Sequence, residues 1–305
     1  MTIWPPACLA CSPLERYRTQ LIVRLPPRLA RDVLRQLWLS VGWRSKKRDV
    51  AKAAGLSYSA HRGGGSGQEH PPLILVHGAG GSRLDWPPEL RRLEGEWVYG
   101  LDLPGHGHSP GEGERTIDRY VEHVCNWMEA VGLERAVLVG HSMGGAIALT
   151  MALDLPSRVE GLVLVATGGR LRVQPAILEL TANTETFNLA LDQVITFYFS
   201  PQTLARLVKL ARTRMAETRP RVLHRDFQAC DRFDVLDRLG EIKVPAQVIC
   251  GVDDRLTPLK YSRFLAEAIP GSRLVTIDGA GHMVMLEQPE EVAGAVKSFL
   301  DDCYR

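Results

Sequence analysis

The chain has 305 residues, of which 45% are hydrophobic and 24% are charged, and its formal net charge at pH 7 is +2. This length suits one large α/β domain or two smaller ones, and the composition is typical of a globular protein that folds in water. No apolar run approaches the roughly 18–20 residues that a membrane-spanning helix needs, so we expect no transmembrane segment. The absence of nucleic-acid-binding motifs argues against nucleic acid as a partner.

Positive charge is concentrated near the start of the sequence. Residues 14–52 contain eleven Lys or Arg against three acidic residues, and residues 29–43 carry an amphipathic pattern. We treat residues 1–49 as a basic N-terminal extension. It is expected to pack on its own domain or to be partly disordered, and peripheral contact with an anionic membrane surface or a partner is the alternative.

The first residues and the cysteines bear on the cellular compartment. The start of the sequence has no basic segment, and its apolar stretch is interrupted by Pro5 and Pro6, so it does not resemble a secretion signal. The six cysteines are scattered, without the spacing of a zinc site or of a disulfide framework. The expected localisation is therefore cytoplasmic, while the sequence carries no indication of oligomeric state.

From about residue 50, short apolar runs alternate with helical patterns. This alternation predicts an α/β fold, with a mostly parallel central sheet flanked by helices. Apolar positions repeat at three and four residues in the predicted helices, which are residues 116–131, 258–268 and 289–303. The predicted strands are residues 73–77, 97–101, 136–140, 161–166, 246–251 and 274–277.

The alternation stops between residues 168 and 238, where the patterns are helical. This segment is predicted to be a helical cap insertion, and the core domain would then consist of residues 50–167 and 239–305. Because the segment connects two strands of the predicted parallel sheet, we expect it to cover the carboxyl ends of the strands. Ligands bind at this edge in open α/β folds.

One serine is flanked by glycines between a predicted strand and a predicted helix. The pattern Gly140-x-Ser142-x-Gly144 at this junction is typical of a nucleophile elbow, a tight turn that leaves no room for side chains two residues to either side of the serine. A serine hydroxyl is a weak nucleophile at neutral pH and needs a base, an acid that orients the base, and donors for the oxyanion. Ser142 is thus the candidate nucleophile.

A base and an acid follow at the ends of the last two predicted strands. His282 lies in a Gly-rich loop after residues 274–277, and Asp254 lies after residues 246–251, next to Asp253. The chain order Ser, Asp, His is the order found in α/β-hydrolases. His282 is therefore the candidate base and Asp254 the candidate acid, with Asp253 as the alternative acid.

Five collinear motifs carry a resemblance to a known family. The chain is similar to the α/β-hydrolase fold superfamily, as a serine esterase-like member, over roughly residues 55–303. The resemblance implies that Asp254 is the acid in preference to Asp253, and that the backbone N–H groups of Ala79 and Met143 form the oxyanion hole. The matching segments are LILVHGAGGS, LDLPGHGHS, VGHSMGG, VICGVDDRLTP and GAGHMVMLEQP.

The activity expected from these residues is that of a carboxylesterase-like serine hydrolase. It would cleave carboxylic esters with short to medium acyl chains through an acyl-enzyme intermediate, with no cofactor and no metal. A lactonase, a cofactor-free perhydrolase and a carbon–carbon bond hydrolase remain alternatives, although the last generally has Asn in place of His141. A non-catalytic protein that binds a small molecule in its capped pocket is the alternative from another class.

Overall fold

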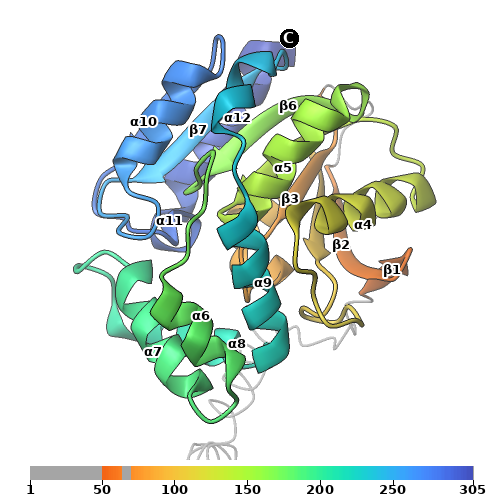
Figure 1. Ribbon diagram of the computed structural model, residues 1–305. Helices are drawn as coiled ribbons and strands as arrows, with labels where there is room; N and C mark the ends of the chain where they lie inside the picture. Colours follow the sequence, from red (N-terminus) through yellow and green to blue (C-terminus); the bar gives the residue numbers. More distant parts are fainter. Residues whose placement is uncertain (1–49, 64–69, 305) are drawn as a thin grey trace, which may run out of the picture. The chain divides into compact units, whose positions relative to one another are not determined.

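The computed structural model describes residues 50–63 and 70–304, so the basic N-terminal extension lies outside the described residues. An eight-stranded sheet forms the centre of this part of the chain, with the strand order β1-β2-β4-β3-β5-β6-β7-β8 (Figure 1). The pairs β1–β2 and β2–β4 are antiparallel, and all other neighbours are parallel. The strands are β1 (Ala51–Ala53), β2 (Leu56–Arg62), β3 (Leu73–Val76), β4 (Trp97–Asp102), β5 (Ala136–His141), β6 (Val159–Val165), β7 (Ala246–Gly251) and β8 (Arg273–Ile277).

Helices cover both faces of this sheet. The helices α4 (Ile117–Ala130) and α5 (Met143–Asp154) pack together in front of the sheet in Figure 1, and α10 (Leu259–Ala268) packs on β7 and β8. The short helix α3 (Pro88–Arg91) packs against α12 (Pro289–Tyr304), which lies behind the sheet. The predicted fold class is confirmed. The remaining short elements are η1 (Arg83–Asp85), η2 (Pro156–Arg158), η3 (Leu236–Glu241) and α11 (Val284–Glu287).

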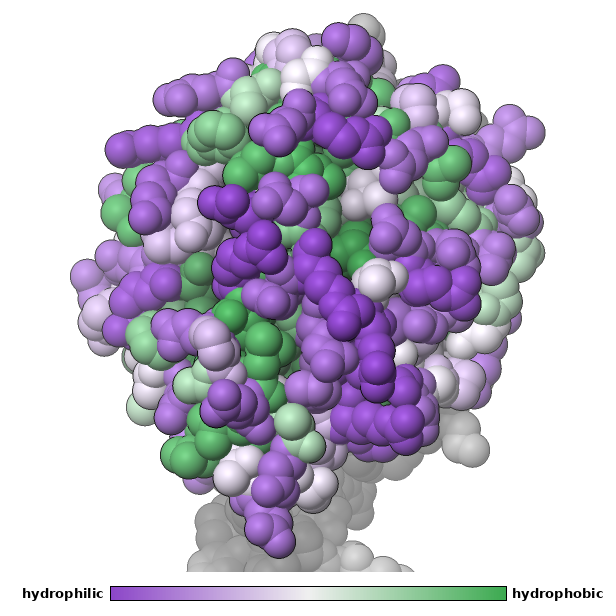
Figure 2. Space-filling model, viewed as in Figure 1, coloured by the Kyte–Doolittle hydropathy of each residue, from purple (hydrophilic) through white to green (hydrophobic). Residues whose placement is uncertain are grey.

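The burial patterns explain why the segments adopt these structures. Strands β3 and β5 are buried along their whole length, as expected for central strands that are covered on both faces. Helix α4 is amphipathic and buries the face of Tyr120, Val124 and Trp127. The face of the molecule that Figure 2 shows is mainly hydrophilic, and its hydrophobic residues form small separate groups. Within the described residues, no helix has the length and apolarity that crossing a membrane requires.

Four α-helices lie between β6 and β7 in the sequence, within the segment that the sequence predicts to be helical. We call residues 168–238 the helical insertion. Its helices contact one another and lie together at one end of the sheet (Figure 1). They are α6 (Pro175–Ala182), α7 (Phe187–Tyr198), α8 (Ala205–Met215) and α9 (Pro220–Arg232).

Candidate active site

Ser142 lies in the tight turn between β5 and α5. Its backbone has φ 51° and ψ −114°, a conformation that costs a non-glycine residue about 1–3 kcal/mol. A Cβ atom on Gly144 would lie 2.1 Å from the carbonyl oxygen of Val76, and one on Gly140 would lie 2.3 Å from that of Gly144. The glycines are therefore required by the close approach of backbone atoms around the turn, as the sequence pattern predicts.

Asp254 and His282 are hydrogen-bonded to each other. Asp254 follows β7 and His282 follows β8, and 3.0 Å separates Asp254 Oδ2 from His282 Nδ1. The Thr257 hydroxyl donates to the same carboxylate oxygen at 2.7 Å, and the N–H groups of Leu256 and Thr257 donate to Oδ1. The carboxylate is thus fixed by three further donors, and its orientation toward the imidazole is set by the loop that follows β7.

The electrostatics of this pair favour an ionised carboxylate. Burial by itself would raise the pKa of Asp254, since desolvation disfavours the charged form. The neighbouring His282 and the hydrogen bonds from His282 and Thr257 outweigh burial, so the pKa of Asp254 lies below its usual value of 3.8. Asp254 is therefore a stable negative charge beside the imidazole near neutral pH.

Ser142 and His282 line one cavity of about 190 Å³, and Ala79 lines it as well. Asp254 is behind His282, and Met143 is the fully buried first residue of α5, where the N–H has no partner within the helix. Much of the remaining wall is apolar and comes from the helical insertion. The apolar residues that it contributes include Leu171, Ile177, Val194, Phe197 and Phe227.

The loop after β3 is held from the core by His77. We call residues 77–81 the β3 loop. The fully buried His77 accepts the N–H of Leu103 at Nε2 (3.0 Å), so Nδ1 carries the proton and donates to the carbonyl of Gly78 (2.8 Å). Burial, followed by the nearby His106, lowers the pKa of His77 to about 4, in keeping with a neutral ring. His77 is thus a structural brace that sets the position of Gly78.

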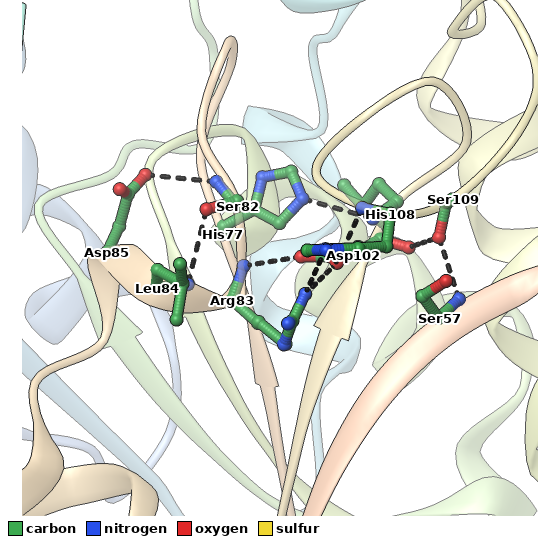
Figure 3. Close-up of polar contacts among 10 residues, drawn as sticks. Ser57, His77, Ser82, Arg83, Leu84, Asp85, Asp102, His108 and Ser109 are labelled. Atoms are coloured by element: carbon green, nitrogen blue, oxygen red, sulfur yellow. Dashed lines mark hydrogen bonds and ion pairs between the residues drawn. The ribbon is translucent and has the colours of Figure 1, made fainter. Parts of the chain in front are cut away.

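A buried ion pair lies beneath the β3 loop (Figure 3). The carboxylate of Asp102, which is fully buried, accepts hydrogen bonds from the guanidinium of Arg83, from the backbone N–H of Arg83 and from the backbone N–H of His108. Its own carbonyl accepts the Ser109 hydroxyl at 2.6 Å, which in turn accepts the N–H of Ser57. The motif LDLPGHGHS therefore shapes a loop, and its aspartate acts through Arg83 on the segment that follows the β3 loop.

The sequence that adopts this fold matches a known protein family. The alpha/beta hydrolase family model matches residues 73–295. The chain belongs to the alpha/beta hydrolase family.

Relatives of this α/β hydrolase are named for different substrates. The chain is 31% identical over 260 residues to "Putative carbamate hydrolase RutD" of Caulobacter sp. (strain K31), covering 81% of this chain and 96% of the relative. It is 31% identical over 265 residues to 2-hydroxymuconate semialdehyde hydrolase of Pseudomonas putida, covering 81% and 92%. A solved structure of a thermophilic esterase is similar at 35% identity and a TM-score of 0.70, covering 83% and 96%. These relatives support hydrolysis as the general activity.

His141, the residue before the serine, has a bonded neighbour of its own in this α/β hydrolase. Its Nε2 lies 3.0 Å from the carbonyl of His282 and therefore donates to it. Burial, together with the proximity of His282, lowers the pKa of His141 to about 3. The His141 ring is thus neutral, and its hydrogen bond holds the backbone of His282 in place. His141 contributes to the geometry of the site in this way.

The helical insertion of this α/β hydrolase is attached to the loops that carry the acid and the base. Asp253 accepts the Ser200 hydroxyl at 2.6 Å, so the two neighbouring aspartates have different partners. Glu287 accepts the N–H of Gly281 at 2.7 Å and the N–H of Ser200 at 2.8 Å. The N–H of Met283 donates to the carbonyl of Tyr198. Sequence reasoning missed Glu287 and Thr257 although both lie in matching motif segments, because the motifs do not indicate which groups these side chains contact.

Replacing Glu287 by Gln is expected to destabilise the fold by about 1–3 kcal/mol, because an amide nitrogen would then face an N–H donor in a partly buried place. The free energy of unfolding, measured by chemical denaturation, checks this. Glu179→Gln on the exposed side of α6 is the control and should leave stability nearly unchanged. Equal stability of the two variants would contradict the attachment role of Glu287.

Proposed function

We propose that this α/β hydrolase is a carboxylesterase-like serine hydrolase that cleaves esters with short to medium acyl chains. The observation that carries the proposal is the buried bond between Asp254 and His282, which backs a cavity that Ser142 and His282 share. An oriented imidazole beside a strained, glycine-flanked serine is the arrangement that activates a hydroxyl for attack on a carbonyl.

In the proposed reaction, His282 takes the proton of Ser142 as the hydroxyl attacks the ester carbonyl. The N–H groups of Ala79 and Met143 stabilise the oxyanion, and Asp254 stabilises the imidazolium. His282 then protonates the leaving alcohol, which breaks the ester bond and leaves the acyl group on Ser142. Water, deprotonated by His282, attacks the acyl-enzyme and releases the carboxylic acid.

The size and lining of the cavity support short acyl groups. A volume of about 190 Å³ with walls such as Leu171, Ile177 and Phe227 favours a compact acyl group over a long one. Ala79 and Tyr198 also line a second cavity of about 700 Å³, which has more polar walls and includes Arg214 and Arg219. We assign the leaving alcohol to the side of this larger cavity, which adjoins the smaller one at Ala79 and Tyr198.

A panel of p-nitrophenyl esters tests the proposal. We expect kcat/KM to be highest between the acetate and the hexanoate and to fall for the decanoate, because the small cavity excludes long chains. A γ-lactone, a carbamate and a carbon–carbon substrate with a vinylogous diketone are measured in parallel, since relatives act on more than one kind of bond. Faster turnover of any of these than of every ester would overturn the ester assignment.

A further inference from the structure

A carboxylate of the helical insertion reaches into the core and contacts the β3 loop. Asp226 lies on α9, and its side chain is fully buried. Its Oδ2 accepts the N–H of Gly80 at 2.8 Å and the Nε2–H of His106 at 2.8 Å, and its Oδ1 accepts the Tyr120 hydroxyl. One side chain thus joins three segments of the core that are far apart in the sequence.

The same insertion also binds the other side of Gly80. The Thr218 hydroxyl donates to the carbonyl of Gly80 at 2.9 Å, in a buried contact. Gly80 has φ +66°, and a Cβ atom on it would lie 2.7 Å from Cδ1 of Leu223 on α9. Both polar backbone groups of Gly80 are therefore bonded to the helical insertion, and α9 covers it closely.

The charge of Asp226 is balanced inside the protein. The ring of His106 is fully buried, and its two nitrogens face Asp226 and the carbonyl of Pro104, both of which are acceptors. Burial would lower the pKa of His106, but Asp226 outweighs it and leaves the pKa raised. A protonated His106 gives the buried Asp226 side chain a hydrogen-bonded cationic partner, so neither group is left buried without a partner.

Ala79 is placed between two supports as a result. His77 holds the carbonyl of Gly78 from the core, and Asp226 and Thr218 hold Gly80 from the helical insertion. The Ala79 N–H belongs to the peptide group whose carbonyl, that of Gly78, is held by His77, and Asp226 holds the N–H of the next peptide group, at Gly80. Its direction depends on both anchors, because a short loop that is fixed at each end has little freedom in the middle.

We propose that Asp226 and Thr218 are positioning residues for the oxyanion hole, so that the Ala79 N–H is correctly aimed only while the helical insertion is seated on the core. The inference rests on the proposed function, in which the Ala79 N–H stabilises the oxyanion. Seating of the helical insertion on the core and the position of the Ala79 N–H are thereby coupled. If the insertion left the core, Gly80 would lose its hydrogen bonds to Asp226 and Thr218, and the Ala79 N–H would no longer be held toward the oxyanion.

The test compares Asp226→Ala and Thr218→Val with the wild-type protein on p-nitrophenyl butyrate. Loss of a whole oxyanion donor costs about 10²–10³ in kcat, so a misdirected donor is expected to cost about 10–100-fold in Asp226→Ala and about tenfold in Thr218→Val. KM should change less than about threefold, because the interaction is made in the transition state. Affinity for 1,1,1-trifluoropentan-2-one, which forms a tetrahedral adduct with the serine, should fall in parallel with kcat/KM.

Two further variants separate positioning from general stability. Asp226→Asn keeps an oxygen that can accept the Gly80 N–H, and it should restore much of the activity lost in Asp226→Ala. Tyr120→Phe removes the donor at the opposite carboxylate oxygen and the acceptor of the Glu114 N–H, and it should lower the melting temperature while kcat stays within about twofold of wild type. Thr218→Val keeps the side-chain volume and remains informative if Asp226→Ala does not fold.

Wild-type kcat and inhibitor affinity in Asp226→Ala or Thr218→Val would overturn the inference. If the wild-type protein shows no Ser142-dependent turnover, the proposed function fails instead, and amide hydrogen exchange of residues 78–81 then decides the positioning role. Faster exchange there in Asp226→Ala and Thr218→Val, but not in Tyr120→Phe, supports it. Unchanged exchange in the first two variants overturns it.

Discussion

Replacing Ser142 by Ala is expected to reduce kcat on p-nitrophenyl butyrate by up to about 10⁶-fold, the loss typical of removing a triad nucleophile. Alanine keeps the backbone of the turn and leaves the bond between Asp254 and His282 intact. Only the attacking oxygen is lost, so KM should change little. The measurement is steady-state hydrolysis, with circular dichroism to show that the variant is folded.

The matched control for this variant is Ser262→Ala. Ser262 is a fully buried serine of α10 that does not line the cavity of Ser142 and His282. Removing its hydroxyl changes the core by the same atom without touching that cavity, so activity should stay near wild type. Turnover by Ser142→Ala at the rate of Ser262→Ala would rule out Ser142 as the nucleophile.

Replacing Asp254 by Asn is expected to lower kcat by about 10⁴-fold, as the equivalent change does in serine proteases. The Thr257 and Leu256 N–H groups would hold the amide oxygen at the position of Oδ1, which places the amide nitrogen toward His282 Nδ1. A donor at that position favours the tautomer in which Nδ1 lacks a proton and Nε2 carries one. His282 could then no longer accept the proton of Ser142.

The neighbouring aspartate provides the control. Asp253→Asn removes a charge one residue away, on a side chain whose carboxylate accepts the Ser200 hydroxyl of the helical insertion. Because this variant leaves the imidazole and its tautomer unchanged, kcat is expected to fall less than about tenfold. The two variants are compared on one ester and over a range of pH, and a larger loss in Asp253→Asn would transfer the role of the acid to Asp253.

Much of the framework can be predicted from local patterns. Central strands such as β3 and β5 are continuous apolar runs because both of their faces are buried, and α4 repeats its apolar residues at helical spacing because one face is buried. The glycines around Ser142 are predictable for a similar reason. Backbone atoms approach the turn so closely that no side chain fits at Gly140 or Gly144.

The residues that hold the loops of the site in place cannot be predicted from local sequence patterns. Asp226 is 146 residues from Gly80 and 120 residues from His106, and in the sequence it is one charged residue of an amphipathic helix. Thr257 and Glu287 lie within two of the matching motif segments, but those segments do not indicate which groups the two side chains contact. Their roles arise from hydrogen bonds between loops, and such bonds depend on how the loops meet rather than on which residues are adjacent.

The sequence by itself therefore determined the six parallel strands from β3 to β8, the turn at Ser142 and the three candidate residues Ser142, Asp254 and His282, whereas the antiparallel strands β1 and β2 were not predicted. These follow from burial and backbone geometry, which act within a few residues, and from the rule that parallel strands present their carboxyl ends at one edge. Only the tertiary structure decided which aspartate contacts His282, how large the cavity is and what holds the β3 loop. These properties depend on distances between segments that folding alone brings together.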